Sequence, residues 1–317
     1  MTTNGKPPGT TAWDESITSL GTRMESYYGR PIVKEPVWQP EIPVYFFTGG
    51  ISGASAVMHV AAKVAGYEKL ERVTLYVGAA TELANPLLLI SDLGRPERFH
   101  HMLRVFKVTS PMSVGSWLLF CSSGATLTST FLRLLGILKP VQVTADVASA
   151  VLGGPLATYT GALIANTSIP VWSEARHELP VLFGTSALAS AGSAALLFVP
   201  PTEARPARRL AVAGAVGELA TMEVMQRRLG FVGEVYKHGQ AGSFARLSKL
   251  CAGAGAALLA ARGGKSRVAA VAGASLLLGG ELALRWSVFR AGFQSARDPR
   301  YTVIPQRERK RAREKTS

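Results

Sequence analysis

Four ionisable side chains lie within long apolar stretches of the sequence: His59, Glu82, Glu218 and Glu281. Placing such a group inside a membrane is costly, so an ionisable residue at that depth indicates a function. A carboxyl or an imidazole there can take up and release protons or hydrogen-bond a ligand. We therefore predict that these four residues form a proton relay. The alternative is that each is buried between helices with its hydrogen bonds satisfied.

The surroundings of Glu82 combine a carboxyl, an amide and a proline within one helical turn, since Asn85 and Pro86 follow it. Pro86 has no N–H to donate to the carbonyl of Glu82, so we expect a kink with unpaired backbone. Such a kink fits a proton site or a ligand site. It equally fits a protonated glutamate that is hydrogen-bonded to a neighbouring helix.

Two further carboxyls have charged neighbours in the sequence. Glu281 and Arg285 are four residues apart, so they share a helix face and can form an ion pair, with proton transfer as the alternative. Glu218 and Glu223 are five residues apart, and either could be a proton station. Glu223 could instead reach the membrane surface beside Arg227.

Few residues could hold a metal ion or a haem. A b-type haem buried between helices needs a facing pair of axial ligands, and His59 is the only histidine in the apolar stretches. The Cys count of 2 excludes a disulfide scaffold, a Cys-rich zinc protein and an iron–sulfur cluster ligated by this chain alone. We therefore expect no metal site and no redox cofactor held by the chain itself.

The apolar stretches are long enough to be membrane helices, which need about 20 apolar residues each. Only 18% of the 317 residues are charged, whereas soluble domains carry about a quarter. The alternation expected of a β-barrel is absent. We predict an all-α integral membrane protein with eight spans, in which small residues such as Gly49 with Gly53 and Gly253 with Ala257 let helices approach. The predicted spans are 42–63, 73–91, 112–135, 147–169, 179–200, 210–226, 247–262 and 268–289.

The segments on either side of the predicted transmembrane domain, 42–290, are polar. Residues 1–41 form a Pro-rich arm without the apolar core of a signal peptide. Residues 291–317 form a basic tail that we interpret as an anchor at the anionic membrane surface. No aromatic residues are interleaved with its charges, so nucleic-acid binding is not expected. Eight spans put both termini on one side, and its excess of Lys and Arg predicts the cytoplasmic face of an inner or plasma membrane.

The loop after the second predicted span contains a tight cluster of Asp92, Gly94, Arg95 and Pro96. Gly94 suits a left-handed turn, and Pro96 can begin a short helix. We predict that this helix lies in the membrane surface and caps a pocket. A lipid-facing connector is the alternative.

Several motifs, in this order and spacing, resemble the NrfD-like family, the membrane subunits of polysulfide-reductase-type and related molybdoenzyme complexes. The motifs are FFTGG at 46–50, LISDLGRP at 89–96, SPMSVGSW at 110–117, YTGAL at 159–163 leading to PVW at 170–172, and a subgroup-like ending at 291–303. The resemblance implies eight helices in two four-helix bundles and no redox cofactor of the chain's own. It also implies electron exchange between a quinone, such as menaquinone, and an iron–sulfur subunit that connects to a molybdopterin-type catalytic subunit.

The resemblance further implies a quinone site. Tyr159 matches a family tyrosine that lies near the quinone, and its phenol could donate a hydrogen bond to a quinone carbonyl. A tyrosine of the interfacial belt is the alternative. We place the quinone headgroup beside Tyr159 and Trp172, with Asp92 and Arg95 at its polar edge. Protons could then arrive through Asp92 from the near side or through the relay from within.

Two other classes of function remain open from the sequence. One is an ion- or proton-coupled transporter, suggested by the buried glutamates and many glycines, which would need internal repeats. The other is a passive anchor that fixes a soluble oxidoreductase to the membrane. It predicts no headgroup-sized pocket near Tyr159.

Overall fold

The computed structural model describes residues 31–201 and 203–315, and every regular element in these ranges is helical. Residues 1–30 of the predicted polar arm lie outside the described ranges. The long helices are α2 (Glu41–Val64), α3 (Glu68–Ser91), α4 (Pro111–Leu135), α5 (Lys139–Ala165), α7 (Glu178–Leu196), α8 (Arg205–Leu229), α9 (Gly239–Arg262) and α10 (Arg267–Arg297). Shorter elements are η1 (Pro96–Leu103), α6 (Pro170–Glu174), η2 (Val232–Lys237) and the terminal helix α11 (Arg300–Glu314).

Seven of the described helices are long and apolar enough to cross a membrane. The exception among the eight long helices is α8, which has 25 residues but carries several arginines and glutamates. It still packs between α7 and α9 through a face of small residues that includes Ala207, Ala211 and Gly214. The predicted all-α membrane protein is confirmed, and the predicted span 210–226 is a bundle helix that is less apolar than the others.

Several helices extend beyond the predicted spans because their charged ends stay helical. Helix α5 begins at Lys139 rather than at 147, α9 begins at Gly239 rather than at 247, and α10 runs on to Arg297. Helix α3 also continues through Pro86 to Ser91. A span boundary that is drawn at the nearest charged residue therefore falls inside the helix and not at its end.

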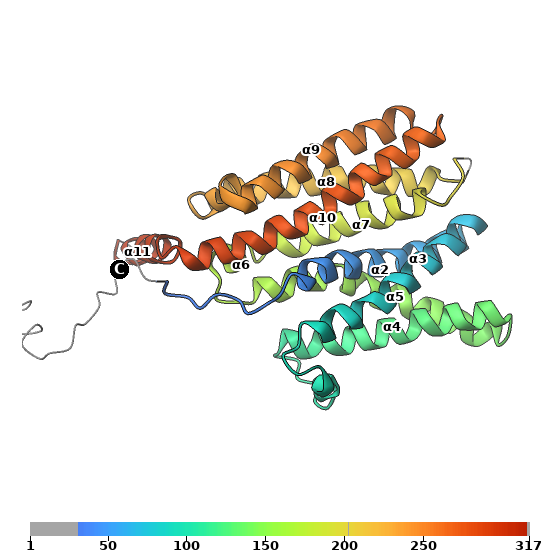
Figure 1. Cartoon of the computed structure of the whole chain (residues 1–317), viewed down its shortest axis with the longest axis horizontal. Helices are drawn as coiled ribbons and strands as arrows, with labels where there is room; N and C mark the ends of the chain where they lie inside the picture. Colours follow the sequence, from blue (N-terminus) through green and yellow to red (C-terminus); the bar gives the residue numbers. More distant parts are fainter. Residues whose placement is uncertain (1–30, 202, 316–317) are drawn as a thin grey trace, which may run out of the picture.

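The long helices form two groups of four that lie side by side (Figure 1). Helices α2 to α5 pack together as a first bundle, and α7 to α10 pack together as a second bundle. The bundles meet where α2 and α5 contact α7 and where α10 contacts α2. This arrangement matches the two bundles that the family resemblance implies.

Glycines allow the closest helix crossings, since each would clash with a neighbouring backbone if it carried a Cβ. A Cβ at Gly53 would lie 2.4 Å from the carbonyl oxygen of Gly153, where α2 crosses α5. A Cβ at Gly214 would lie 2.4 Å from the backbone nitrogen of Ala189, where α8 crosses α7. The predicted contact role of Gly53 is confirmed, whereas that of Gly253 is wrong, because a Cβ there would meet nothing within 4 Å.

One end of the molecule carries the strap of residues 31–40, α6, η1 and α11 (Figure 1). Two polar contacts help to hold the strap. The Arg297 guanidinium binds the Glu35 carboxylate at 2.9 and 3.0 Å, and the backbone N–H of Gln39 donates to the Asp92 carboxylate at 2.7 Å. Both termini of the described chain therefore lie at this end, which also carries the site described next.

Candidate functional site

A hollow of about 380 Å³ lies in the first bundle at the end that carries the strap. It is enclosed by the first turns of α2 and α4, the last turns of α3 and α5, and η1. Its walls are almost wholly apolar, and the polar side chains among them are Tyr45, Asp92, Ser116 and Ser123. Its volume is in the range of small-molecule sites. We call it the apolar pocket.

Local sequence signals shape the cap over the apolar pocket. Pro96 begins η1, and Phe99, Met102 and Leu103 from η1 face the pocket. The Ser110 hydroxyl then accepts from the backbone N–H of Ser113 and caps the start of α4. The predicted cap is present, but the predicted left-handed turn at Gly94 is wrong, because Gly94 has no positive φ.

Asp92, one of the two residues predicted for the polar edge of the quinone site, sits on the rim of the apolar pocket at the end of α3. Burial and the nearby Glu41 raise the pKa of its carboxyl, and the hydrogen bond from the Gln39 N–H opposes them. The carboxyl thus faces the pocket while it fixes the strap. Arg95, the other predicted edge residue, is exposed at the start of η1 and does not line the pocket.

Tyr159 lies between α5 and α4, close behind the pocket wall. Its hydroxyl donates to the carbonyl of Pro111 at 2.8 Å. Its ring fills the space over Gly115, where an added Cβ would lie 1.8 Å from the Tyr159 Oη. Tyr159 is not part of the pocket lining, so its hydroxyl would have to leave Pro111 to reach a bound ligand.

Trp172 is fully buried and backs the pocket rather than lining it. Its Nε1 donates to the carbonyl of Val288 at 2.8 Å, and its ring stacks on Trp38 with centroids 5.6 Å apart. Trp38, on the strap, is the tryptophan that contributes to the pocket wall. Trp38 was not predicted to line a site, because the whole polar arm was expected to lie on the surface. A tryptophan in a polar, Pro-rich segment was the available signal.

Beneath the pocket, Glu82 is buried in a polar cluster that includes the pocket-lining Ser123. The hydroxyls of Ser122 and Ser123 donate to its two carboxyl oxygens at 2.8 and 2.7 Å. The Asn85 amide lies 3.4 Å from the carboxyl, and its oxygen accepts from the Thr48 hydroxyl at 2.7 Å. A single hydrogen bond, from the Ser123 hydroxyl, thus links the Glu82 carboxyl to the pocket lining.

His59 lies deeper in the first bundle, fully buried against an acidic residue that the sequence analysis missed. Its Nε2 is 3.1 Å from a carboxylate oxygen of Asp146, and its Nδ1 is 2.9 Å from the carbonyl oxygen of Glu71. Lys63 and Ser129 also bind Asp146, the former at 2.5 Å. Asp146 was missed because it falls one residue before the charge-free run from which span 147–169 was defined.

Hydroxyl groups fill the interval between the Glu82 cluster and His59. Thr48, Ser52, Ser55 and His59 repeat at helical spacing along α2. The buried hydroxyls of Ser55 and, on α4, Thr126 have no hydrogen-bond partner. Both side chains flank Gly78, because the Ser55 Cβ and the Thr126 Cγ2 lie 3.5 and 3.8 Å from the Cβ position of this glycine. Two buried hydroxyls that lack a hydrogen-bond partner, both on side chains beside Gly78, mark a place suited to a bridging water.

The remaining predicted relay residues, Glu218 and Glu281, meet in the second bundle and not in the first. The Glu218 carboxyl accepts from Ser248 at 3.2 Å, and the Glu281 carboxyl accepts from Ser186. The predicted ion pair between Glu281 and Arg285 is not among the contacts within 4 Å in the described ranges. The Arg285 guanidinium instead lies 3.8 Å over the Phe183 ring, on α7.

Glu223 behaves as the surface alternative predicted. It is exposed and binds Arg227 at 2.8 Å and Lys249 at 3.7 Å. It therefore stabilises the outer face of α8 and α9 rather than joining the buried carboxyls.

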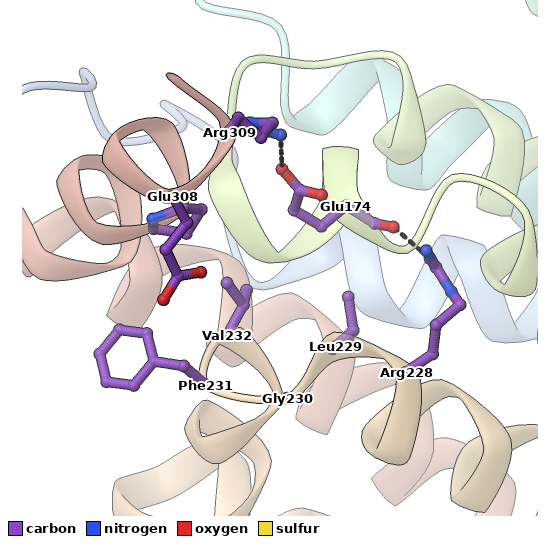
Figure 2. A pocket seen from close by; sticks show the side chains of 9 residues that line it. Glu174, Arg228, Leu229, Gly230, Phe231, Val232, Glu308 and Arg309 are labelled. Carbon is purple, nitrogen blue, oxygen red and sulfur yellow. Dashed lines mark hydrogen bonds and ion pairs between the residues drawn. The ribbon is translucent and has the colours of Figure 1, made fainter. Parts of the chain in front are cut away.

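A second hollow, of about 340 Å³, lies where α6, the end of α8 and α11 meet (Figure 2). Arg309 on α11 binds the Glu174 carboxylate at 2.6 Å, and Arg228 binds both the Glu174 carbonyl and Glu178. These contacts fasten the basic α11 to the bundle. Four charged side chains, Glu174, Arg228, Glu308 and Arg309, line this hollow, so the apolar pocket is the better candidate for an apolar ligand.

No group of three or more His, Cys, Asp or Glu side chains is placed to hold a metal ion within residues 31–201 and 203–315.

Comparison with known proteins gives one family match. No curated protein matches the chain. The family model described as polysulphide reductase, NrfD, matches residues 32–232, which include the strap, the whole first bundle with its apolar pocket, and α7 and α8. This match spans more than half of the chain, which therefore belongs to the polysulphide reductase NrfD family.

Proposed function

We propose that the apolar pocket binds a quinone headgroup, and that the chain passes electrons between the quinone pool and a partner iron–sulfur subunit. Membership of the NrfD family makes the chain a membrane subunit of a quinone-linked oxidoreductase complex. NrfD subunits in general partner with iron–sulfur and molybdopterin catalytic subunits. The observation that carries the proposal is the apolar pocket itself, with a carboxyl on its rim and a second carboxyl one hydrogen bond below it.

The lining of the pocket suits a flat, mostly apolar ring that carries two carbonyl acceptors. Aromatic and aliphatic walls bury the ring faces. The Ser116 and Ser123 hydroxyls lie within the lining, and each would have to turn away from its present acceptor, the Met112 carbonyl or the Glu82 carboxyl, to donate to a quinone carbonyl. Tyr159 is a further donor if its hydroxyl leaves Pro111. Trp172 holds Trp38 in the wall, and the exposed Arg95 serves the face on which a partner docks.

Reduction of a quinone consumes two electrons and two protons, and the chain offers two proton routes. Asp92 on the rim can exchange protons with water at the near side. Glu82 can exchange protons through Ser123 at the pocket floor. Menaquinone or a related quinone would act as a diffusible substrate, with the electrons entering or leaving through a cofactor of the partner.

The inner route would continue from Glu82 past Ser55 to His59. Both ring nitrogens of His59 face oxygen atoms that can only accept from it while Asp146 is ionised. The His59–Asp146 pair therefore has a place for one extra proton, and a water at Gly78 would close the gap to Glu82. We propose that this route, from Glu82 past Ser55 to His59, moves protons across the first bundle.

We propose that the partner subunits dock at the end that carries the strap, η1 and α11. Electrons must enter close to the pocket, and η1, whose Phe99, Met102 and Leu103 line the pocket, lies at this end. We propose that this end, with both chain termini, faces the cytoplasm of the cell's inner or plasma membrane. Protease accessibility of terminal tags in sealed vesicles tests this orientation.

Filling the pocket tests the quinone proposal. Ser116→Phe adds a ring inside the pocket from the lining of α4, whereas Thr128→Phe adds the same ring at an exposed position of that helix. In the purified complex, S116F should abolish quinone-analogue binding and quinone-linked turnover, and T128F should leave both near the native level. A passive anchor or a transporter predicts that the native protein itself does not bind the analogue.

A further inference from the structure

The terminal helix α11 is strongly basic and lies outside the residues that the family model matches. Segment 300–315 contains seven Lys and Arg against two Glu. The described side chains from 307 to 315 are all exposed, and the helix lies beyond the ends of the long helices (Figure 1). It does not line the apolar pocket, so its charges have no role in that site.

One face of α11 is fixed to the rest of the molecule. The Tyr301 ring stacks on Phe231 with centroids 5.1 Å apart, and the Arg309 guanidinium binds the Glu174 carboxylate at 2.6 Å (Figure 2). Pro305 lines the hollow beside them. Tyr301, Pro305 and Arg309 are four residues apart, so they share one face of the helix. These contacts set the rotation of α11 about its axis, so its opposite face is presented outward in a defined orientation.

The opposite face of α11 is a stripe of three cations, Arg307, Arg311 and Lys315, which we call the cationic stripe. The three are spaced four residues apart, and each is exposed. None of them forms an ion pair or hydrogen bond through its side chain within residues 31–201 and 203–315, whereas the neighbouring Lys310 is paired with Glu314 at 3.8 Å. Like charges at this spacing repel one another. The stripe therefore suits an anionic surface that would relieve the repulsion.

Two features favour a protein over a lipid surface as the partner of the cationic stripe. A helix that lies in a membrane surface buries an apolar face among the lipids, but residues 306–315 contain no apolar side chain larger than alanine. The helix also begins outside the lipid. Helix α10 continues for about 12 Å beyond the predicted span 268–289 before α11 starts, whereas a headgroup layer is about 5–8 Å thick.

We propose that the cationic stripe is a docking surface for an acidic face of the iron–sulfur subunit. This proposal rests on the docking of partner subunits at this end of the molecule, and it does not depend on quinone binding. Complementary charge raises the rate of association and selects the partner. Because Tyr301 and Arg309 already hold α11 in place, docking requires little additional ordering of the chain.

Charge reversal tests the proposal on the full-length chain in nanodiscs, with binding of the separately purified iron–sulfur subunit measured by biolayer interferometry. Arg307→Glu combined with Arg311→Glu should weaken binding by about tenfold or more, because each exposed pair contributes a factor of about 1.5–5 and reversal adds repulsion. High salt should weaken native binding and shrink this difference. The matched control is Arg72→Glu combined with Arg262→Glu, which reverses two exposed cations at the opposite end and should bind as the native chain does.

Labelling of Arg311→Cys with a membrane-impermeant maleimide separates a protein partner from a lipid surface. The native chain gives the background from Cys121 and Cys251. Saturating iron–sulfur subunit should protect the introduced thiol, and adding phosphatidylglycerol to phosphatidylcholine nanodiscs should not. Protection by phosphatidylglycerol alone would overturn the proposal in favour of a lipid anchor, and so would native binding by the reversed variant. If the subunit protects a thiol introduced by Arg72→Cys instead, the proposed docking end fails as well.

Discussion

Gly115→Ala is expected to displace Tyr159 without changing any polar group. The added Cβ would lie 1.8 Å from the Tyr159 Oη and Cζ, whereas ordinary contact begins at 3.4 Å, so the ring must move by about 1.6 Å. The move breaks the hydrogen bond to Pro111, worth about 1 kcal/mol. Overpacking of this kind costs about 1–3 kcal/mol, and the alanine returns at most about 1 kcal/mol of helix propensity. We expect a net loss of about 1–3 kcal/mol in the free energy of unfolding.

A matched control lies on the same helix. Gly124 has open space around its Cβ position, so Gly124→Ala should be neutral or should stabilise by up to about 1 kcal/mol. The assay is reversible denaturation in detergent, together with quinol-linked turnover of the purified complex. If Tyr159 donates to the quinone, G115A and Tyr159→Phe should each lower turnover by about tenfold or more, and G124A should not. Native turnover in G115A, with the expected loss of stability, would refute the role of Tyr159.

Further substitutions probe the other parts of the site. Trp172→Phe deletes the indole hydrogen bond and part of a fully buried ring, and should cost about 1–3 kcal/mol of unfolding free energy; a native melting temperature would contradict this. Asp146→Asn removes the buried carboxylate that Lys63 and His59 contact and should destabilise the protein by about 3 kcal/mol or more, with proton-coupled turnover also reduced; an effect below about 1 kcal/mol would mean that the Lys63–Asp146 pair is solvated. Gly78→Leu should block the route from Glu82 past Ser55 to His59 and slow proton uptake from the far side of the membrane, measured with a pH dye in vesicles, while quinone-analogue binding stays native. Unchanged proton uptake would exclude this route. Because burial and Glu41 raise the pKa of Asp92 in the folded state, its protonated form stabilises the fold at pH values below the unfolded pKa, and this contribution is lost as the pH rises through the folded pKa. Asp92→Asn should therefore gain in melting temperature relative to the native protein as the pH rises across this window, and a difference that does not change with pH would contradict the raised pKa.

The sequence predicted those features that depend on the length and polarity of single segments. The apolar runs located the long helices, and the cluster from Asp92 to Pro96 located the cap of the pocket. The polar setting of Glu82 was visible in the neighbouring Asn85, which does bind it.

Features that depend on contacts between helices were harder to predict. Arg285 was expected to bind Glu281 on its own helix, but α7 offers it an aromatic face and a carbonyl instead. Asp146 and Trp38 were missed because rules based on charge and polarity assigned them to the water outside the spans. Both are placed by packing, Asp146 through Lys63 and His59 on α2, and Trp38 through its stack on Trp172. Spacing along one segment does not encode such partners.

The most direct test of the central claim is photolabelling of the purified complex with an azido-quinone, followed by mapping of the labelled peptides. The account predicts label on η1 and on the first turns of α4, at residues such as Met102 and Met112 that line the pocket. Excess unlabelled quinone should displace this label. Label confined to the second bundle or to the hollow beside α11, or label that excess quinone does not displace, would contradict it.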